Sequence, residues 1–557
     1  MQVNASARSR AVRQRACLRP TSEPSSSGNP DIARHPGIAM RCPGPVTLAS
    51  AHGSNSTGDK RGLGGCTAPV YPAADAVSPY WYQPPQSRNR TGAIARICLH
   101  PRAGEDEDTH LSVAWYSLPS RVKEGIMRRS LLYRSMVAGV LVCCGMGCLE
   151  VHAQPEPGQY RVYPLPIASP DHGIRALLTG PADFDASPFG WHDTNGASGA
   201  EFTILRGNNA WVYVDADANN TPDGPGPDGG STLQFDYLAS PYTLPPTSQE
   251  AALATNAFYL VNSFHDILWQ HGFQEVDGNF QENNYGRGGT GGDPVQVEIL
   301  DGATTNNANG STAPTDGSQA RIQLGIWTAA NPDRGASYAA DVVAFAYMQA
   351  VQTRLLGSGC GGNVDSPRIG NLDFFAALVS NDFTATTPAT PHGLGTFLLN
   401  QPVTGTGART YPYSVDLAIN PSTYLDSSSS SVYGMGLIYA SALWDLAWSL
   451  VGQIGASDDL LTGNGGENVS LRLLVLALKI QPCNAGLLDG RDAFLEADNN
   501  LYQGQYTCNI WNAFARRGMG LSAEQGPTIS TADNVAAFDV PASCSDTIFA
   551  DGFDVLP

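Results

Sequence analysis

The stretch DVVAFAYMQAVQTRL, residues 341–355, decides how the fold is interpreted. Its apolar residues recur at helical spacing, and they occupy most sides of the helix that this spacing predicts. A helix that is apolar nearly all round is buried among other elements. We therefore expect a buried helix over residues 338–355, in the core of the protein.

The segments on the two sides of this helix differ in character. Short runs typical of strands precede it, namely EFTILRG (201–207), AWVYVDA (210–216), VQVEIL (295–300) and ARIQLGIW (320–327). One helical run, 248–272, also precedes it, and long helical runs follow it at 434–455, 468–483, 489–502 and 508–520. Strands first and helices second indicate an α+β fold.

Composition divides the chain into six segments. Residues 1–126 are rich in Arg, Pro, Ser and Gly without lasting periodicity, which is typical of a start codon assigned too early or of a disordered extension. The other five are a signal peptide (127–153), a strand-rich part (154–247), the region with the central helix (248–360), a helical lobe (361–543) and a tail (544–557).

The signal peptide is recognised by its three parts. Arg128 and Arg129 make a basic start, an apolar run extends from residue 136 to residue 149, and Ala153 is the small residue that signal peptidase prefers. The apolar run is too short for a stable membrane span. We expect export, extracellular or periplasmic, with cleavage near Ala153.

Charge is unevenly distributed along the chain. Residues 1–153 hold 18 of the 32 Lys and Arg but only 10 of the 51 Asp and Glu, so the remainder carries 14 basic and 41 acidic residues, a formal charge of 14 − 41 = −27. Such a surface repels nucleic acid and anionic membranes. We therefore expect no nucleic-acid partner.

Two features of the exported part bear on its stability, and the first is its set of cysteines. Four cysteines, Cys360, Cys483, Cys508 and Cys544, predict two disulfides among three connectivities, and the pair Cys483–Cys508 is favoured because it encloses one compact segment.

The second feature is the loop DADANNTPDGPGPDGG, residues 215–230. It places Asp215, Asp217, Asn219 and Asp223 at nearly alternating positions, as calcium loops place their oxygen ligands. The glutamate that closes an EF-hand loop is missing. An acidic glycine-rich turn is therefore the preferred interpretation, and a calcium loop is the alternative.

Several longer stretches resemble one protein family. ATNAFYLVNSFHDILWQHGF (254–273), GNFQENNYGRGGTGGDPV (278–295) and LALKIQPCNAGLLDGRDAFLEAD (476–498) are similar to segments of the fungalysin metallopeptidases, and the likeness runs in order from about residue 160 to 540. Members of that family are secreted zinc endopeptidases. The resemblance implies a thermolysin-like architecture of two lobes, with the active-site helix between them.

The active-site helix departs from the family. Its motif is H-E-x-x-H, in which histidines at i and i+4 bind zinc and the glutamate acts as general base. In this chain the first histidine position is Phe345, the glutamate position is Ala346 and the second histidine position is Gln349.

The remaining functional positions depart as well. The third zinc ligand of the family, a glutamate, corresponds to Ile369, and its transition-state histidine corresponds to Tyr433. Phenylalanine and isoleucine have no donor atoms, and glutamine is a poor zinc ligand. The resemblance therefore implies a homologue without a zinc site, so that no cofactor is expected, with zinc present only where the family function is retained. We expect Phe345, Ala346 and Ile369 to fill the volume of the metal site.

Three functions follow from these residues. The preferred one is an inactive homologue whose former cleft binds a peptide or protein by strand addition. The second is an active zinc metalloendopeptidase that uses other ligands, and the third is hydrolysis without a metal. The five exported histidines form no H-x-x-x-H pair, and there is no G-x-S-x-G motif; they are His172, His192, His265, His271 and His392.

Overall fold

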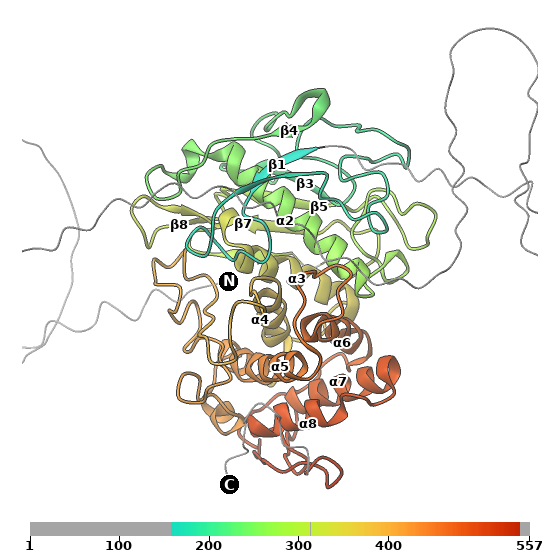
Figure 1. Ribbon diagram of the computed structural model, residues 1–557, viewed down its shortest axis with the longest axis vertical. Helices are drawn as coiled ribbons and strands as arrows, with labels where there is room; N and C mark the ends of the chain where they lie inside the picture. Colours follow the sequence, from blue (N-terminus) through green and yellow to red (C-terminus); the bar gives the residue numbers. More distant parts are fainter. Residues whose placement is uncertain (1–157, 312, 546–557) are drawn as a thin grey trace, which may run out of the picture. The chain divides into compact units, whose positions relative to one another are not determined.

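The computed structural model describes residues 158–311 and 313–545 (Figure 1). The predicted N-terminal extension, the signal peptide and most of the tail lie outside the described residues. Within the described part, strands dominate before residue 336 and helices after residue 339. The predicted α+β class is confirmed.

The strand-bearing half contains three small sheets. The first has the order β2-β1-β4, and the second, in which β3, β5 and β7 run parallel and β6 is antiparallel, has the order β3-β5-β7-β6. Strands β8 and β9 form the third. Their bounds are β1 Gln159–Val162, β2 Ala176–Thr179, β3 Ala210–Val214, β4 Gln234–Phe235, β5 Val295–Ile299, β6 Ala308–Gly310, β7 Arg321–Leu324, β8 Ile326–Trp327 and β9 Arg334–Gly335.

One predicted strand is wrong. The stretch 201–207 forms only isolated bridges, in which Ile204 pairs with Asp228 and Arg206 pairs with Trp211. Its β-branched and aromatic residues resemble those of a strand, but no neighbouring strand runs alongside it for more than one residue at a time. A strand forms only where a partner satisfies its backbone groups, and sequence composition does not supply that partner.

Helix α3, Ala340–Leu356, is the element that the opening stretch predicts. It packs against β6 and β7 on one side and against α4, Arg368–Val379, on another. In Figure 1, α3 and α4 lie between the sheets with α2, Glu250–Gln270, and the lower helices. The first turn of α3 is held by Asp341, whose carboxylate accepts hydrogen bonds from the backbone N–H groups of Val342 and Gly395.

The remaining helices form the helical half. They are α5 Val432–Ile454, α6 Gly466–Ile480, α7 Leu487–Tyr502 and α8 Thr507–Arg516, and short 3-10 turns lie at Gly230–Thr232, Pro246–Ser248, Glu275–Asp277, Ala336–Tyr338 and Tyr424–Ser429. Helix α5 packs against α4, α6 and α8. It is the one helix of the described part that is long and apolar enough to cross a membrane, but 89% of its most apolar window is buried, as in a core helix.

The disulfides correct the predicted pairing. Cys360 pairs with Cys483 and Cys508 pairs with Cys544, so the favoured Cys483–Cys508 bond is wrong. Cys483 precedes α7, and Cys508 follows it in the first turn of α8. The 16 residues of α7 span roughly 24 Å at a rise of about 1.5 Å per residue, so the helix keeps the two thiols apart.

Candidate functional site

The positions that correspond to functional residues of the family lie on three consecutive helices, α3, α4 and α5. Phe345, Ala346 and Gln349 lie on α3, Ile369 lies on α4, and Tyr433 is the second residue of α5. Helix α4 packs on both α3 and α5, which brings the positions to one region of the fold.

The side chains at these positions are those of a packed core. Phe345 and Ala346 are 3% and 0% exposed and belong to the main hydrophobic cluster, and Ile369 packs against that cluster. A Cβ placed on Gly436 of α5 would lie 2.5 Å from Cγ2 of Ile369, so the isoleucine occupies the space over that glycine. Gln349 and Tyr433 are half-buried.

A buried arginine adjoins the same region, and sequence reasoning missed it. The guanidinium carbon of Arg409 lies 5.7 Å from the ring centroid of Phe345 and 5.1 Å from that of Tyr433. Both distances are within the range of a cation–π interaction. The arginine therefore covers the phenylalanine at the first ligand position and the tyrosine at the position of the family histidine.

Arg409 is held in place by an ion pair with α4. Its Nε and Nη2 atoms each lie 2.6 Å from one carboxylate oxygen of Asp373, and the Tyr413 hydroxyl donates to Asp373 at 2.6 Å. Burial lowers the pKa of Arg409, but the carboxylate of Asp373 outweighs burial and holds that pKa above its ordinary value. The guanidinium is therefore charged and fixed in orientation.

The residues present do not fit a zinc ion. Zinc needs three or four nitrogen, sulfur or carboxylate donors, whereas positions 345, 346, 349 and 369 supply one amide group. In the part of the chain that the structure describes, the groups of His, Cys, Asp or Glu side chains able to share a metal ion lie beside β3 and β5, and none includes a residue of α3, α4 or α5.

None of the five histidines lies on α3, α4 or α5. His265 contacts the carboxylate of its neighbour Asp266 at 2.9 Å, and His271 contacts the carbonyl of Leu460 at 2.8 Å. Burial lowers the pKa of His192 and His271 to about 4 and that of His392 to about 3. These are properties of neutral imidazoles packed inside the protein.

Two serine–histidine contacts bear on hydrolysis without a metal. The hydroxyl of Ser380 lies 3.1 Å from Nε2 of His392, and the same hydroxyl lies 2.6 Å from the carbonyl of Ala376. The hydroxyl donates to that carbonyl, so this pair lacks the hydroxyl-to-imidazole hydrogen bond of a serine hydrolase. The other contact, between Ser169 and His172, lies within a turn.

The predicted calcium loop begins directly after β3. The structure places carboxylate oxygens of Asp215, Asp217 and Asp223 within 4.8 Å of one another. The side-chain oxygen of Asn219 accepts a hydrogen bond from the Thr221 backbone N–H, and its side-chain amide donates to Asp217.

A second acidic group shares Asp215 and adds two residues that sequence reasoning missed, Glu298 of β5 and Asp301 just after it. A single glutamate in a strand of the type VQVEI indicates an outward-facing residue. Only the pairing of β3 with β5 brings Glu298 close to Asp215.

Two cavities of more than 300 Å³ border the helices. One, of about 360 Å³, is lined by the hydroxyl-rich segment before α5 and by Arg409; its residues are Ala408, Arg409, Thr410, Ser429, Ser430, Ser431, Tyr433 and Gly434. It adjoins Tyr433 and so extends the candidate site toward the surface.

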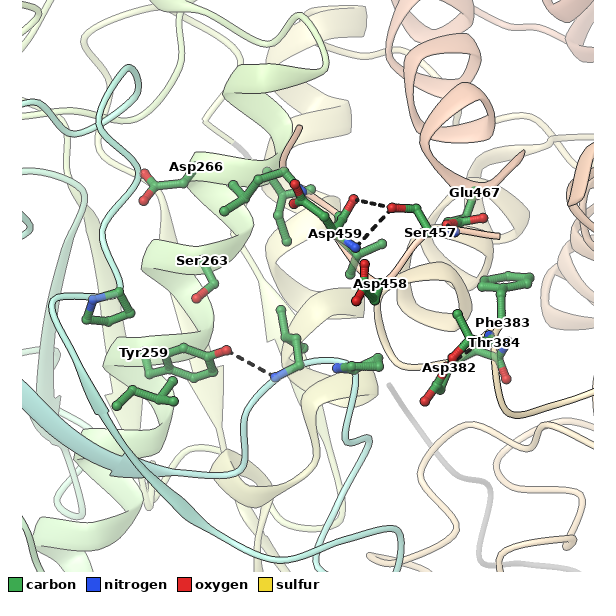
Figure 2. A pocket seen from close by; sticks show the side chains of 18 residues that line it. Tyr259, Ser263, Asp266, Asp382, Phe383, Thr384, Ser457, Asp458, Asp459 and Glu467 are labelled. Carbon is green, nitrogen blue, oxygen red and sulfur yellow. Dashed lines mark hydrogen bonds between the residues drawn. The ribbon is translucent and has the colours of Figure 1, made fainter. Parts of the chain in front are cut away.

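The other cavity, of about 440 Å³, lies between α2, the segment after α4 and the loop after α5 (Figure 2). Figure 2 shows Ser263 of α2 on one side of it and Asp458 and Asp459 on the other, while the carboxylate of Asp266 points away from those two aspartates. Asp266 already accepts hydrogen bonds from Ser187, Trp191 and the Asp183 backbone, so its role is structural.

Comparisons with known proteins identify relatives of this chain. The model of the fungalysin metallopeptidase family (M36) matches residues 159–523. Extracellular metalloproteinase 1 of Trichophyton tonsurans is 35% identical over 402 residues, 69% of this chain and 61% of that protein. Extracellular metalloproteinase MEP of Fusarium vanettenii is 35% identical over 386 residues, 67% of this chain and 59% of that protein.

Among solved structures, the precursor of protealysin, a metalloproteinase from Serratia proteamaculans, aligns with a TM-score of 0.31 and 12% identity, over 59% of this chain and 91% of that one. The chain spans about 61% of the length of the curated relatives it matches. The family model matches well over half of the chain. The chain therefore belongs to the fungalysin metallopeptidase family.

Proposed function

We propose that this protein is a catalytically inactive fungalysin homologue whose former cleft binds an extended peptide segment. The observation that carries the proposal is the set of side chains where α3, α4 and α5 meet. Phe345, Ala346 and Ile369 offer neither a metal ligand nor a base. Without the ion there is no activated water and no polarised carbonyl, so peptide hydrolysis loses its chemistry.

The edge strand β6 supports the peptide-binding part of the proposal. In the sheet order β3-β5-β7-β6 it is the last strand, so one of its sides faces away from the sheet. It lies directly against α3, since a Cβ on Gly310 would lie 2.2 Å from the carbonyl oxygen of Ala346. A segment that adds to β6 would therefore pass close to the altered positions of α3.

Arg409 and the cavity beside it support a polar contact with that segment. Two of the guanidinium nitrogens are engaged by Asp373, while Nη1 has only a 3.3 Å contact with the carbonyl of Ala408. A peptide carbonyl could accept a hydrogen bond from Nη1, and the serine hydroxyls of the same cavity could bind further backbone groups. The partner expected from these groups is a peptide or protein chain.

Export is part of the proposal. The relatives are named extracellular metalloproteinases, and two disulfides are typical of an oxidising compartment. N-terminal sequencing of the protein recovered outside an expressing cell should begin near Gln154. Recovery of the protein inside the cell with the segment 127–153 still attached would contradict export.

Family membership favours a second candidate, an active zinc endopeptidase with ligands from elsewhere. Restoring the family residues separates the two. The variant Phe345→His/Gln349→His/Ile369→Glu should bind about one zinc per chain, because it supplies two imidazoles and a carboxylate from α3 and α4. Adding Ala346→Glu and Tyr433→His should then give casein hydrolysis.

The triple variant is the matched control, since it holds zinc without a base and should remain inactive. Wild-type protein should show neither zinc nor hydrolysis. Casein hydrolysis by washed wild-type protein that chelator abolishes would establish the second candidate instead.

A further inference from the structure

We propose that a calcium ion binds at the ends of β3 and β5, held by Asp215, Glu298 and Asp301, with Asp217 and Asp223 completing the site from the loop after β3. This inference is independent of the proposed peptide-binding function. It concerns a site in the strand-bearing half, built from elements other than α3, α4 and α5.

Strand pairing brings the three buried acids together. Strands β3 and β5 are parallel and in register, so that Tyr213 pairs with Glu298 and Val214 pairs with Ile299. Parallel strands end at the same edge of a sheet, and Asp215 and Asp301 follow the two strands there. The backbone N–H of Gly302 donates to the carbonyl of Asp215 at 2.9 Å, which ties the two strand ends together.

The spacing of the carboxylates suits calcium. Oxygens of Asp215, Glu298 and Asp301 all lie within 4.8 Å of one another, and so do those of Asp215, Asp217 and Asp223. Calcium binds oxygen at about 2.3–2.6 Å, so ligands on opposite sides of one ion are about 5 Å apart. Asp215 belongs to both groups and would be the ligand that joins them.

Two buried oxygens point to a missing ligand. Glu298 is 0% exposed and Asp301 is 2% exposed, and Oε2 of the first and Oδ2 of the second have no hydrogen-bond partner within the described residues. Their other oxygens are engaged, by the Tyr213 hydroxyl at 3.0 Å and by the Ala303 backbone N–H at 2.8 Å. A buried carboxylate oxygen without a donor is costly, and a cation removes that cost.

The balance of charge also favours a cation. Arg321 contributes one positive charge, with Nε 2.8 Å from Oε1 of Glu298. The five carboxylates together carry five negative charges, so four of them are not balanced by Arg321. The site therefore holds anions that repel one another until a cation is bound.

The donor set selects among cations. All five side chains offer carboxylate oxygens, the ligands of calcium and magnesium, and none offers the nitrogen or sulfur that zinc and copper prefer. Two of the five, Asp217 and Asp223, come from an exposed loop of glycine and proline. Ligands from a loop suit the six to eight ligands and irregular geometry of calcium better than the small, strict octahedron of magnesium.

Thermal unfolding of the full-length protein tests the inference. We expect the midpoint in millimolar calcium chloride to exceed that in EGTA by about 3 °C or more, since an ion that binds only the folded state stabilises it. Calorimetric titration with calcium should give about one site per chain.

Two variants make the test specific. In Asp301→Asn, calcium should no longer raise the midpoint of thermal unfolding. The midpoint in EGTA should stay equal to that of wild type or increase, because one repelling charge is gone. The midpoint in EGTA separates loss of the calcium site from a failure to fold. In Asp333→Asn, an exposed acid outside the cluster, the rise should persist. An unchanged wild-type midpoint, a rise retained by Asp301→Asn, or an equal rise with magnesium would each overturn the assignment.

Discussion

Arg409 packs against two of the positions that correspond to functional residues of the family. Its guanidinium lies against two aromatic rings, those of Phe345 and Tyr433, and forms a bidentate ion pair with Asp373. Both charged side chains are 2% exposed or less. A buried ion pair is costly to break because the remaining partner is left charged and unpaired.

The change Asp373→Ala should therefore destabilise the protein by about 3–5 kcal/mol. Urea unfolding followed by circular dichroism gives the free energy of unfolding. The control is Asp492→Ala, which breaks a pair with Arg491 in which the aspartate is 60% exposed and which should change little. Equal losses in the two variants would mean that Arg409 is not fixed by Asp373 as the structure shows.

His392 gives a second prediction at the scale of the residue. Burial lowers the pKa of its imidazole to about 3, against 6.5 for the ordinary value. Below pH 6.5 the unfolded chain binds a proton that the folded protein binds only near pH 3, so the histidine makes stability fall as pH falls through that window.

In His392→Gln this contribution should disappear. The slope of unfolding free energy between pH 6 and 4 should become less positive by up to about 1.4 kcal/mol per pH unit. Comparing the two slopes isolates the histidine from buried acids such as Asp341, whose pKa burial raises to about 6 and whose effect has the opposite sign. Parallel slopes for the two proteins would contradict the low pKa.

At the scale of elements, α3 depends on a close approach by β6. The sequence predicts α3 well, because its apolar spacing is regular over the whole helix. It does not predict what packs against it. Gly310 of β6 lies so close that a Cβ would be 2.2 Å from the Ala346 carbonyl oxygen.

The change Gly310→Ala should therefore push β6 away from α3. We expect a loss of about 1–3 kcal/mol in unfolding free energy, as for other overpacked sites. Gly362→Ala is the matched control, since a Cβ there meets nothing within 4 Å. If both variants unfold at the same urea concentration as wild type, β6 does not pack on α3 as described.

One failed prediction and one missed residue at this scale share one physical reason. The stretch 201–207 has the composition of a strand, but it pairs with its neighbours through single isolated bridges only. Glu298 looks like a surface residue in sequence, and it is buried beside Asp215 because β3 and β5 pair. Local patterns predict elements, while pairing between distant segments decides which residues meet.

At the scale of the whole molecule, the two disulfides connect distant segments. The sequence left the pairing of their cysteines undecided. The bond Cys360–Cys483 closes a separation of 123 residues, and Cys508–Cys544 closes one of 36 residues. Order of elements and family resemblance were readable from sequence. The pairing was not, because it depends on where α7 places its two ends.

Removing the disulfide that closes the longer loop should lower the free energy of unfolding more than removing the other one. In the chain-entropy account, Cys360→Ser/Cys483→Ser should lose about 1 kcal/mol more unfolding free energy than Cys508→Ser/Cys544→Ser. Peptide mapping without reduction should recover the two cross-linked pairs. A cross-link between Cys483 and Cys508 would contradict the arrangement of α7 and α8.

The central claim is that a metallopeptidase scaffold has kept its helices and lost its metal. Zinc content, measured by mass spectrometry on washed, exported protein shown to be folded by circular dichroism, tests this claim most directly. We predict near-zero zinc per chain, because Phe345, Gln349 and Ile369 cannot form the site. About one tightly held zinc per chain would contradict the account, and His265 and His271 would then be the first residues to mutate.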